Sequence, residues 1–373
     1  MLYRSLLILL SCSLLACGGA GSSSEPAGSS SFTQHSFESD TLPQRDYWLF
    51  KPSSSASERT LVIYLHGCNQ SAPDAAIGTR WNELAEQQGV YVAYPDQKDP
   101  NEQEFSGEQL EDHLFDGNGA RCWNWFRPEH IQRDQGEAGT IAAITSELIE
   151  ELDIDPNRVF IMGISAGAIM ASTVSTLYPD LFAAAALVAG CAYPACTDST
   201  GSLSYQAMGE HAQRMPVVIF QGTADEIQPY PLGREALHQS LGMNDWADDG
   251  SLNGSIPYTA DQTQDYGLDS SLFAGVGTVG DTCVRNSNSP CIGGALGIQQ
   301  SYPFTLETFV DGNQCPLIQF WTIHGLAHNY PGGNTEGSFT DPLGPDITAV
   351  AYNFFLAQAR DGSYYQTPAV CSL

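Results

Sequence analysis

The stretch Val159-Phe160-Ile161-Met162-Gly163-Ile164-Ser165-Ala166-Gly167 decides the fold of this chain. Its first four residues form a short, uniformly apolar run that is typical of a buried strand. The run Ala166–Leu177 is long enough for a helix and ends before Tyr178-Pro179. The stretch therefore predicts a strand, a sharp turn at Ser165 and a helix.

The same alternation of short apolar strands and helices extends in both directions. Strands are predicted at Thr60–Leu65, Val90–Tyr94, Ala184–Ala189, Val217–Phe220 and Leu317–Ile323, and helices at Arg80–Gln88, Glu137–Leu152 and Asp346–Ala359. Uniformly apolar strands separated by helices predict an α/β fold, with a mostly parallel central sheet and helices on both faces. Two polar stretches interrupt the pattern. We interpret Asp96–Arg121 as a long loop and about 242–300 as an insertion on the rim of the sheet.

Ser165 is the strongest chemical signal because the pattern Gly163-x-Ser165-x-Gly167 lies between a predicted strand and a predicted helix. This is the context of a nucleophile elbow, in which a tight turn lifts the serine hydroxyl above the sheet. The flanking glycines leave room for a strained backbone, and the start of the helix directs free N–H groups at the same point. The alternative is a glycine-rich turn with an idle serine.

A nucleophilic serine needs a base, and the base needs an orienting carboxylate. We predict that His328 is the base, because the loop Gly325–Gly333 follows a strand and can hold a side chain over the sheet. Asp225 is predicted to be the acid, because it directly follows the strand that begins at Val217. Other histidines after Ser165 are interpreted as surface residues (His211, His238) or as a residue that is structural or supports the site from behind its first layer (His324).

Acyl chemistry also requires N–H donors for a developing oxyanion. The residue after the nucleophile, Ala166, supplies one backbone N–H. The loop after the early strand, His66-Gly67-Cys68-Asn69-Gln70, is the predicted source of the second, from Cys68. His66 itself is either a packed residue at the end of a strand or part of the site wall.

The composition excludes several classes of partner. The chain has 373 residues and a formal net charge of −29, so its surface would repel the phosphates of nucleic acids. The same charge argues against docking to anionic lipid through a basic patch. No Cys or His cluster has the spacing of a zinc site, and we expect neither a metal nor a cofactor.

The first residues read as an export signal. A cation at Arg4 precedes a short apolar run, which is too short to span a membrane. Leu14-Leu15-Ala16-Cys17 is similar to a bacterial lipoprotein signal box, so we predict a signal peptide at 1–16, lipidation of Cys17 and a Gly/Ser-rich tether at 17–40. The catalytic domain is expected over 41–373, without a linker to a further polymer-binding module. Alternatives are a box ending at Cys12, or an ordinary cleaved signal peptide.

If the protein is exported, its cysteines are expected to form disulfide bonds. Of the ten cysteines, eight remain after Cys12 and Cys17 are set aside, and an even number in an exported protein favours disulfide bonds. The pattern alone leaves the pairing open among Cys68, Cys122, Cys191, Cys196, Cys283, Cys291, Cys315 and Cys371.

Several segments together resemble one known family. They are Leu65–Gln70, Tyr94–Gln97, Cys122-Trp123-Asn124-Trp125-Phe126, Gly163–Gly167, Gly222–Asp225, His328–Gly333 and Gly337–Asp346, in family order. The chain is similar to the secreted poly(3-hydroxybutyrate) depolymerases and the related feruloyl and acetylxylan esterases. The resemblance implies an α/β-hydrolase fold, a triad of Ser165, Asp225 and His328, and an oxyanion wall in the loop that contains Cys68.

The resemblance also implies where an ester substrate binds. Trp123 and Trp125 either line a groove for an apolar polymer or aromatic acyl group, or pack in the core; His66, Gln70 and Tyr330 are further predicted contacts. The family often has Ala-Trp where this chain has Asn329-Tyr330, and His where it has Gln221, which leaves the substrate open.

The resemblance places Cys68 and Cys122 beside the active site, so we expect them to be bonded to each other. The alternative is a free Cys68 thiol, with Cys122 paired elsewhere. The expected activity is hydrolysis of polyester or its oligomers by a serine esterase. The alternatives are a feruloyl or acetylxylan esterase and, from another class, a non-catalytic binding protein tethered to the surface.

Overall fold

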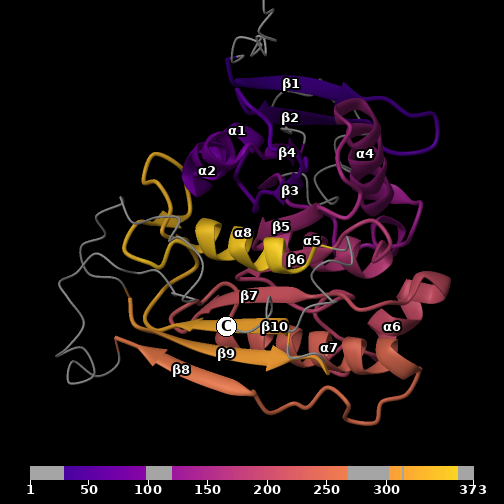
Figure 1. The fold of residues 1–373 in the computed structure, drawn as a ribbon, viewed down its shortest axis with the longest axis vertical. Helices are drawn as coiled ribbons and strands as arrows, with labels where there is room; N and C mark the ends of the chain where they lie inside the picture. The colour runs from indigo at the N-terminus through magenta and orange to yellow at the C-terminus, as the bar shows by residue number, and fades with distance from the viewer. Residues whose placement is uncertain (1–28, 98–119, 268–301, 313–314, 360–373) are drawn as a thin grey trace, which may run out of the picture.

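The protein is described from a computed structural model, which covers residues 29–97, 120–267, 302–312 and 315–359. Its main sheet has ten described strands in the order β1-β2-β4-β3-β5-β6-β7-β10-β9-β8 (Figure 1). They are β1 Ser31–Phe37, β2 Arg45–Lys51, β3 Leu61–Leu65, β4 Tyr91–Pro95, β5 Val159–Ile164, β6 Ala184–Val188, β7 Val217–Gly222, β8 Gln262–Tyr266, β9 Phe304–Val310 and β10 Pro316–Ile323.

The centre of the sheet is parallel and its margins are antiparallel. Strands β4, β3, β5, β6, β7 and β10 pair in parallel, whereas β1, β2, β8 and β9 join them antiparallel. Every residue of β3, β5, β6 and β7 is buried, as expected for strands covered on both faces. The predicted parallel core is confirmed.

Helices cover the two faces of the sheet and form two apolar cores. Helices α4 Gly136–Leu152, α5 Ala166–Leu177 and α7 Tyr230–Asp249 contribute to one core, with the short α6 Ser202–Met208 at its margin. Helices α1 Ala72–Thr79, α2 Trp81–Gln88 and α8 Ile347–Ala357 contribute to the other. Figure 1 shows α8 in front of the central strands, and the ring of Phe355 on α8 stacks on Phe160 of β5 at 4.7 Å between centroids.

The predicted tether extends too far toward the domain. Residues 17–28 lie outside the described part of the chain, but Ser31–Phe37 is strand β1, paired in register with β2. The prediction of a tether up to residue 40 is therefore wrong in its last part. The error arose because β1 is an edge strand whose side chains are mostly exposed or half-buried, so it carries no continuous apolar run.

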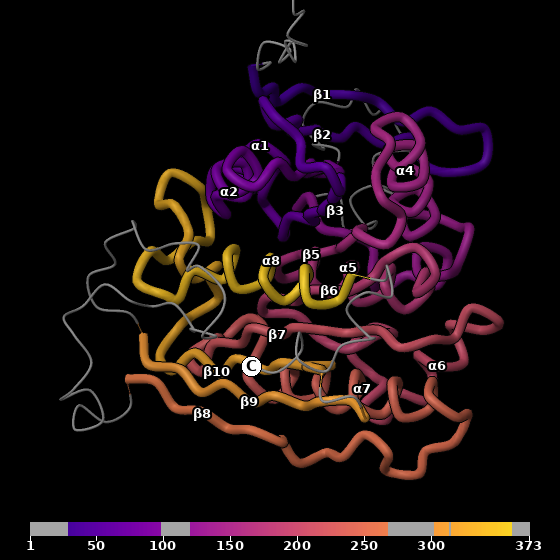
Figure 2. Tube along the Cα trace, viewed as in Figure 1, coloured from indigo at the N-terminus to yellow at the C-terminus, as the bar shows by residue number. Residues whose placement is uncertain are grey.

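The predicted insertion at 242–300 also proves to be partly regular structure. Helix α7 continues to Asp249, and β8 forms one edge of the sheet, opposite β1 (Figure 2). Gly242 does not break α7, because it lets the helix pack closely on a neighbouring loop. A Cβ at this position would lie 2.1 Å from the carbonyl oxygen of Thr200. The remainder of the predicted insertion, 268–301, lies outside the described residues.

None of the helices in the described ranges combines the length and the apolar character that a bilayer crossing requires.

Candidate active site

Ser165 occupies the sharp turn between β5 and α5, as the sequence predicted. Its backbone has φ of 56° and ψ of −125°, a region that non-glycine residues rarely adopt and that marks functional sites. The N–H of Ser165 donates to the carbonyl of Val188 at 2.9 Å, and its own carbonyl accepts the first bond of α5 from Ile169. Its half-buried side chain makes no hydrogen bond to the start of α5.

Two glycines make this turn possible by allowing close backbone contact. A Cβ at Gly163 would lie 2.3 Å from the carbonyl oxygen of Gly167, and a Cβ at Gly167 would lie 2.2 Å from that of Leu65. Both distances are shorter than any real contact, so the pattern Gly-x-Ser-x-Gly packs the helix start directly onto β3.

Asp225 and His328 meet at the same edge of the sheet. Strands β5, β6, β7 and β10 are parallel neighbours, so the segments after their carboxyl ends lie together. The Nδ1 atom of His328 lies 2.8 Å from Oδ2 of Asp225, and both side chains are buried. With Asp225 ionised, Nδ1 carries the hydrogen and Nε2 keeps a lone pair that can accept a proton.

The loops of this pair are held by their own backbones. The other oxygen of Asp225 accepts the N–H groups of Ile227 at 2.9 Å and Gln228 at 2.8 Å. The N–H of Ala224 donates to the carbonyl of Leu326 at 3.0 Å and thereby joins the two loops. The carboxylate is therefore oriented before any substrate binds.

The N–H groups predicted for the oxyanion are free in the described structure. Ala166 is the first residue of α5, where a helix has no internal acceptor for its N–H. Within the described ranges, no acceptor takes the N–H of Cys68. A Cβ on the adjacent Gly67 would lie 3.4 Å from Cβ of Ser165, so this loop runs beside the serine.

A disulfide joins Cys68 to Cys122, as expected. A second disulfide joins Cys191 to Cys196, and Cys315 is also disulfide-bonded. The remaining predicted disulfide cysteines (Cys283, Cys291 and Cys371) lie outside the described residues, as does the predicted lipidation site, Cys17.

The side chains of four predicted substrate contacts are buried and hydrogen-bonded inside the protein: His66, Gln70, Trp123 and Tyr330. Trp123 donates its indole N–H to the carbonyl of His66 at 2.9 Å, which favours the core-packing alternative. Gln70 holds the oxyanion loop instead, accepting from Gly67 N–H at 2.8 Å and donating to the Ser338 carbonyl at 2.9 Å. Tyr330 lies 2.6 Å from the hydroxyl of Thr348.

The other substrate contact, Trp125, is half-buried and lies edge-on to the exposed ring of Phe126. These two side chains give the segment after Cys122 an apolar, partly accessible surface. Ile227, which follows Asp225 by two residues, is 62% exposed. Each of these two segments therefore carries an exposed apolar side chain.

The remaining histidines have structural surroundings. His324 lies 3.0 Å from the hydroxyl of Thr305, consistent with the structural role expected from the sequence. His211 is partly exposed beside Asp180, and His238 packs edge-on against Tyr258.

A partly buried polar cluster contacts the oxyanion loop, and sequence reasoning missed it. Asp96 accepts the N–H of Ala72 at 3.0 Å and a guanidinium N–H of Arg121 at 3.1 Å, and its carboxylate lies 3.3 Å from the ring of His66. Burial by itself would raise the pKa of the Asp96 carboxyl. The contacts with His66, Arg121 and Ala72 outweigh burial and lower that pKa below its ordinary value of 3.8.

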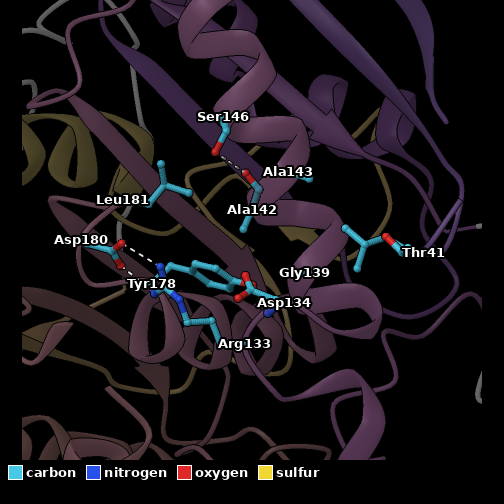
Figure 3. Close-up of a pocket in the computed structure, with 11 residues that line it drawn as sticks. Thr41, Arg133, Asp134, Gly139, Ala142, Ala143, Ser146, Tyr178, Asp180 and Leu181 are labelled. Atoms are coloured by element: carbon cyan, nitrogen blue, oxygen red, sulfur yellow. Dashed lines mark hydrogen bonds and ion pairs between the residues drawn. The ribbon is translucent and has the colours of Figure 1, made fainter. Parts of the chain in front are cut away.

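A surface pocket of about 360 Å³ lies beside α4, and no triad or oxyanion residue lines it. Figure 3 shows the guanidinium of Arg133 facing the carboxylate of Asp180, with the ring of Tyr178 alongside. Arg133 is thus paired with Asp180, and the hydroxyl of Tyr178 donates to Asp134 at 3.3 Å. Among the described residues, no group of three or more His, Cys, Asp and Glu side chains is placed to hold a metal ion.

The chain is similar in sequence to polyester depolymerases and to acetylxylan esterases. The chain is 29% identical over 283 residues to poly(3-hydroxyalkanoate) depolymerase C of Paucimonas lemoignei, covering 75% of this chain and 57% of that protein. It is 24% identical to poly(3-hydroxybutyrate) depolymerase of Ralstonia pickettii, covering 83% and 55%. A probable acetylxylan esterase A of Aspergillus fumigatus is 27% identical, covering 43% and 40%. The chain thus spans little more than half the length of the two depolymerases.

Among solved structures, an acetyl xylan esterase from Aspergillus awamori superposes with a TM-score of 0.57 at 18% identity, covering 87% of this chain and 99% of that chain. This likeness concerns the fold, and the predicted α/β-hydrolase architecture is confirmed. The model of the esterase PHB depolymerase family matches residues 45–240, more than half of the chain. The chain therefore belongs to the esterase PHB depolymerase family.

Proposed function

We propose that this chain is a serine esterase that cleaves carboxylic esters through an acyl-enzyme, with Ser165 as nucleophile, His328 as base and Asp225 as orienting acid. The observation that carries the proposal is the strained turn at Ser165, on the same sheet edge as the Asp225–His328 contact of 2.8 Å. A strained serine and an oriented imidazole together form the arrangement that nucleophilic acyl transfer needs.

In the proposed reaction, Nε2 of His328 takes the proton of Ser165 as its oxygen attacks the ester carbonyl. The N–H groups of Cys68 and Ala166 stabilise the oxyanion of the tetrahedral intermediate. The protonated His328 then donates to the departing alcohol, which leaves the acyl group on Ser165. A water molecule, deprotonated by His328, hydrolyses this acyl-enzyme and restores the serine.

The substrate class that we propose is poly(3-hydroxybutyrate)-type polyester or its oligomers. The two depolymerases align with 75% and 83% of this chain, whereas the probable acetylxylan esterase aligns with 43%. Phe126, four residues after Cys122, and Ile227, two residues after Asp225, have exposed apolar side chains, which suits a polyester without charge. A feruloyl or acetylxylan ester is the alternative, supported by the relatives with those names.

Two experiments test the proposal. A fluorophosphonate probe should label the wild-type protein and not Ser165→Ala, since the probe reacts only with an activated serine. An unlabelled wild-type protein would favour the non-catalytic binding protein. Purified protein should then be compared on a hydroxybutyrate film, hydroxybutyrate oligomers, methyl ferulate and acetylated xylan. Faster release of ferulate or acetate than of hydroxybutyrate would overturn the polyester assignment.

We also propose that the protein is exported and anchored through lipid on Cys17. The disulfides Cys68–Cys122 and Cys191–Cys196 are typical of an oxidising compartment and support export. Metabolic labelling with a fatty-acid analogue should mark the wild-type protein and not Cys17→Ser. Label that persists in Cys17→Ser, or none in the wild-type protein, would refute the anchor.

A further inference from the structure

We infer that Glu137 is a positioning residue for catalysis: its buried carboxylate, paired with Arg45, fixes the segment 122–124 and through it the oxyanion loop. This inference rests on the proposed esterase function. Glu137 lies in the first turn of α4, and its side chain is 1% exposed. A carboxylate this deeply buried requires charged and hydrogen-bonded partners.

Four donors from three separate segments surround the carboxylate. Arg45 of β2 donates from Nη2 at 3.0 Å, and the side chain of Gln97 donates to the same oxygen, Oε1. Asn124 donates twice, from its backbone N–H to Oε2 at 2.7 Å and from its side chain to Oε1 at 3.0 Å. Glu137 therefore joins β2, the end of β4 and the segment 122–124 in one place.

The same cluster reaches the oxyanion loop by three routes. Gln97 donates its side-chain N–H to the carbonyl of Cys122 at 2.9 Å, and its backbone N–H to Nε2 of His66 at 3.0 Å. Trp123, which lies under the guanidinium of Arg45 at 5.4 Å, donates its indole N–H to the carbonyl of His66 at 2.9 Å. The Cys68–Cys122 disulfide is the third route.

These contacts hold both sides of the Cys68 N–H. His66 precedes it by two residues and is bonded to the cluster, and Cys68 itself is tied to the segment that Glu137 holds. An oxyanion donor acts only when it is fixed near the position of the developing charge. The contacts around Glu137 therefore act on the reaction through the position of this N–H.

A second ion pair joins the same two elements, but at the surface. Lys51 and Glu151, near the other ends of β2 and α4, pair at 3.2 Å with side chains 34% and 53% exposed. An exposed pair pays little desolvation cost, whereas a buried pair is often no more stable than apolar residues of similar size. The buried pair of Arg45 and Glu137 occurs where the segment 122–124 needs a fixed acceptor.

The test replaces both charges at once. In Arg45→Met with Glu137→Leu, no unpaired charge is left buried, but Asn124 and Gln97 lose their acceptor, so the full-length protein should fold with a lowered melting temperature. We expect kcat on a short p-nitrophenyl ester to fall by about a hundredfold, as for loss of an oxyanion donor, with KM nearly unchanged. The matched control, Lys51→Met with Glu151→Leu, removes the exposed pair from the same elements and should keep wild-type kcat.

If the double variant does not fold, a milder variant can test the same inference. Trp123→Phe keeps both charges and removes the indole N–H that bonds the carbonyl of His66. We expect kcat to fall by about fivefold with KM unchanged, which corresponds to the roughly 1 kcal/mol that a neutral hydrogen bond contributes. The inference is overturned by wild-type kcat in whichever of these variants folds, or by an equal loss in the Lys51 and Glu151 control.

The wild-type protein separates this inference from the proposed function. If fluorophosphonate does not label the wild-type protein and no ester is cleaved, the esterase assignment fails. If the wild-type protein is labelled and active, while the Arg45 and Glu137 variant is folded and equally active, only the role of Glu137 fails.

Discussion

The two sides of the proposed active site are built differently. The acid–base side consists of two loops, 223–228 and 324–328, and its decisive contacts are within or between these loops. The oxyanion side consists of the loop 66–70, and it is held by a disulfide, by the pair of Arg45 on β2 and Glu137 on α4, and by contacts from Gln97 and Trp123. The acid–base side orients its histidine through a few contacts within two loops. The oxyanion side fixes one backbone N–H through many contacts with residues that are distant in the sequence.

The difference reflects what each side must do. His328 needs one hydrogen bond to set its ring orientation and tautomer, and Asp225 supplies it. The Cys68 N–H lies in a loop with no strand or helix of its own, so its position depends on the neighbours that pack around it. We therefore expect losses on the acid–base side to affect proton transfer, and losses on the oxyanion side to affect transition-state binding and stability together.

The largest effect should come from Ser165→Ala, which removes the atom that both sides serve. We expect a loss of kcat of about a million-fold, as for removal of the serine from a complete triad. Circular dichroism and the melting temperature should match the wild type, since Ala fits the same turn. Near-normal hydrolysis of p-nitrophenyl butyrate by this variant would contradict the assignment of Ser165.

A substitution on the acid–base side alone should reduce kcat by less than Ser165→Ala does. Asp225→Asn keeps the shape of the side chain but removes the charge that orients His328, so we expect kcat to fall by about 10⁴-fold. The matched control is Asp248→Asn, at an exposed position near the end of α7, which should keep wild-type kcat. A mild Asp225→Asn phenotype would assign the acid to another carboxylate.

Breaking the oxyanion side should reduce both rate and stability. Cys68→Ala with Cys122→Ala opens a disulfide of sequence separation 54. We expect the free energy of unfolding to fall by about 4 kcal/mol from chain entropy. We expect kcat to fall by about a hundredfold as the Cys68 N–H loses its anchor.

The second disulfide provides the control. Cys191→Ala with Cys196→Ala opens a bond of sequence separation 5, so the expected stability loss is smaller, about 2 kcal/mol. Urea unfolding and kcat should be measured on both pairs of variants. An equal loss of kcat in the two pairs would mean that the Cys68–Cys122 bond has no special link to the reaction.

The smallest expected effect is a pH-dependent change in the melting temperature when Asp96 is replaced. The contacts of Asp96 with His66, Arg121 and Ala72 outweigh burial and lower the pKa of its carboxyl below 3.8 in the folded protein. Because this pKa is lower in the folded protein than in the unfolded chain, the ionised Asp96 carboxylate stabilises the fold at pH values above the unfolded-state pKa. This stabilisation is lost as the pH falls through the folded-state pKa. Asp96→Asn should therefore lower the melting temperature at pH 6 and approach the wild type near pH 3.

An exposed aspartate makes the comparison specific. Asp40→Asn changes a carboxylate at the surface and should shift the melting temperature little at either pH. If the gap between Asp96→Asn and the wild type stays constant from pH 6 to pH 3, then Asp96 does not couple protonation to the stability of the oxyanion side.

The core of the fold followed from hydrophobic patterns along the chain. Strands β3 to β7 and helices α2, α4 and α5 lie within a residue or two of the predicted ranges, because each is an apolar run or a helical stripe with a clear stop. The edge strand β1 and the helix α7 were missed for different reasons. Exposed edge strands lack an apolar run, and Gly242 in α7 serves close packing where glycine usually indicates a break.

The sequence by itself determined the strand–turn–helix at Ser165 and the choice of Asp225 and His328, since glycines, apolar runs and strand ends act through backbone conformation over a few residues. Only the tertiary structure decided that Gln70 and Tyr330 are buried, and that Trp123 and His66 take the packed position that the sequence had left as an alternative. It alone paired Arg45 with Glu137, which is 92 residues away. Burial and charge pairing depend on which distant segments come into contact, and a local sequence pattern does not contain that information.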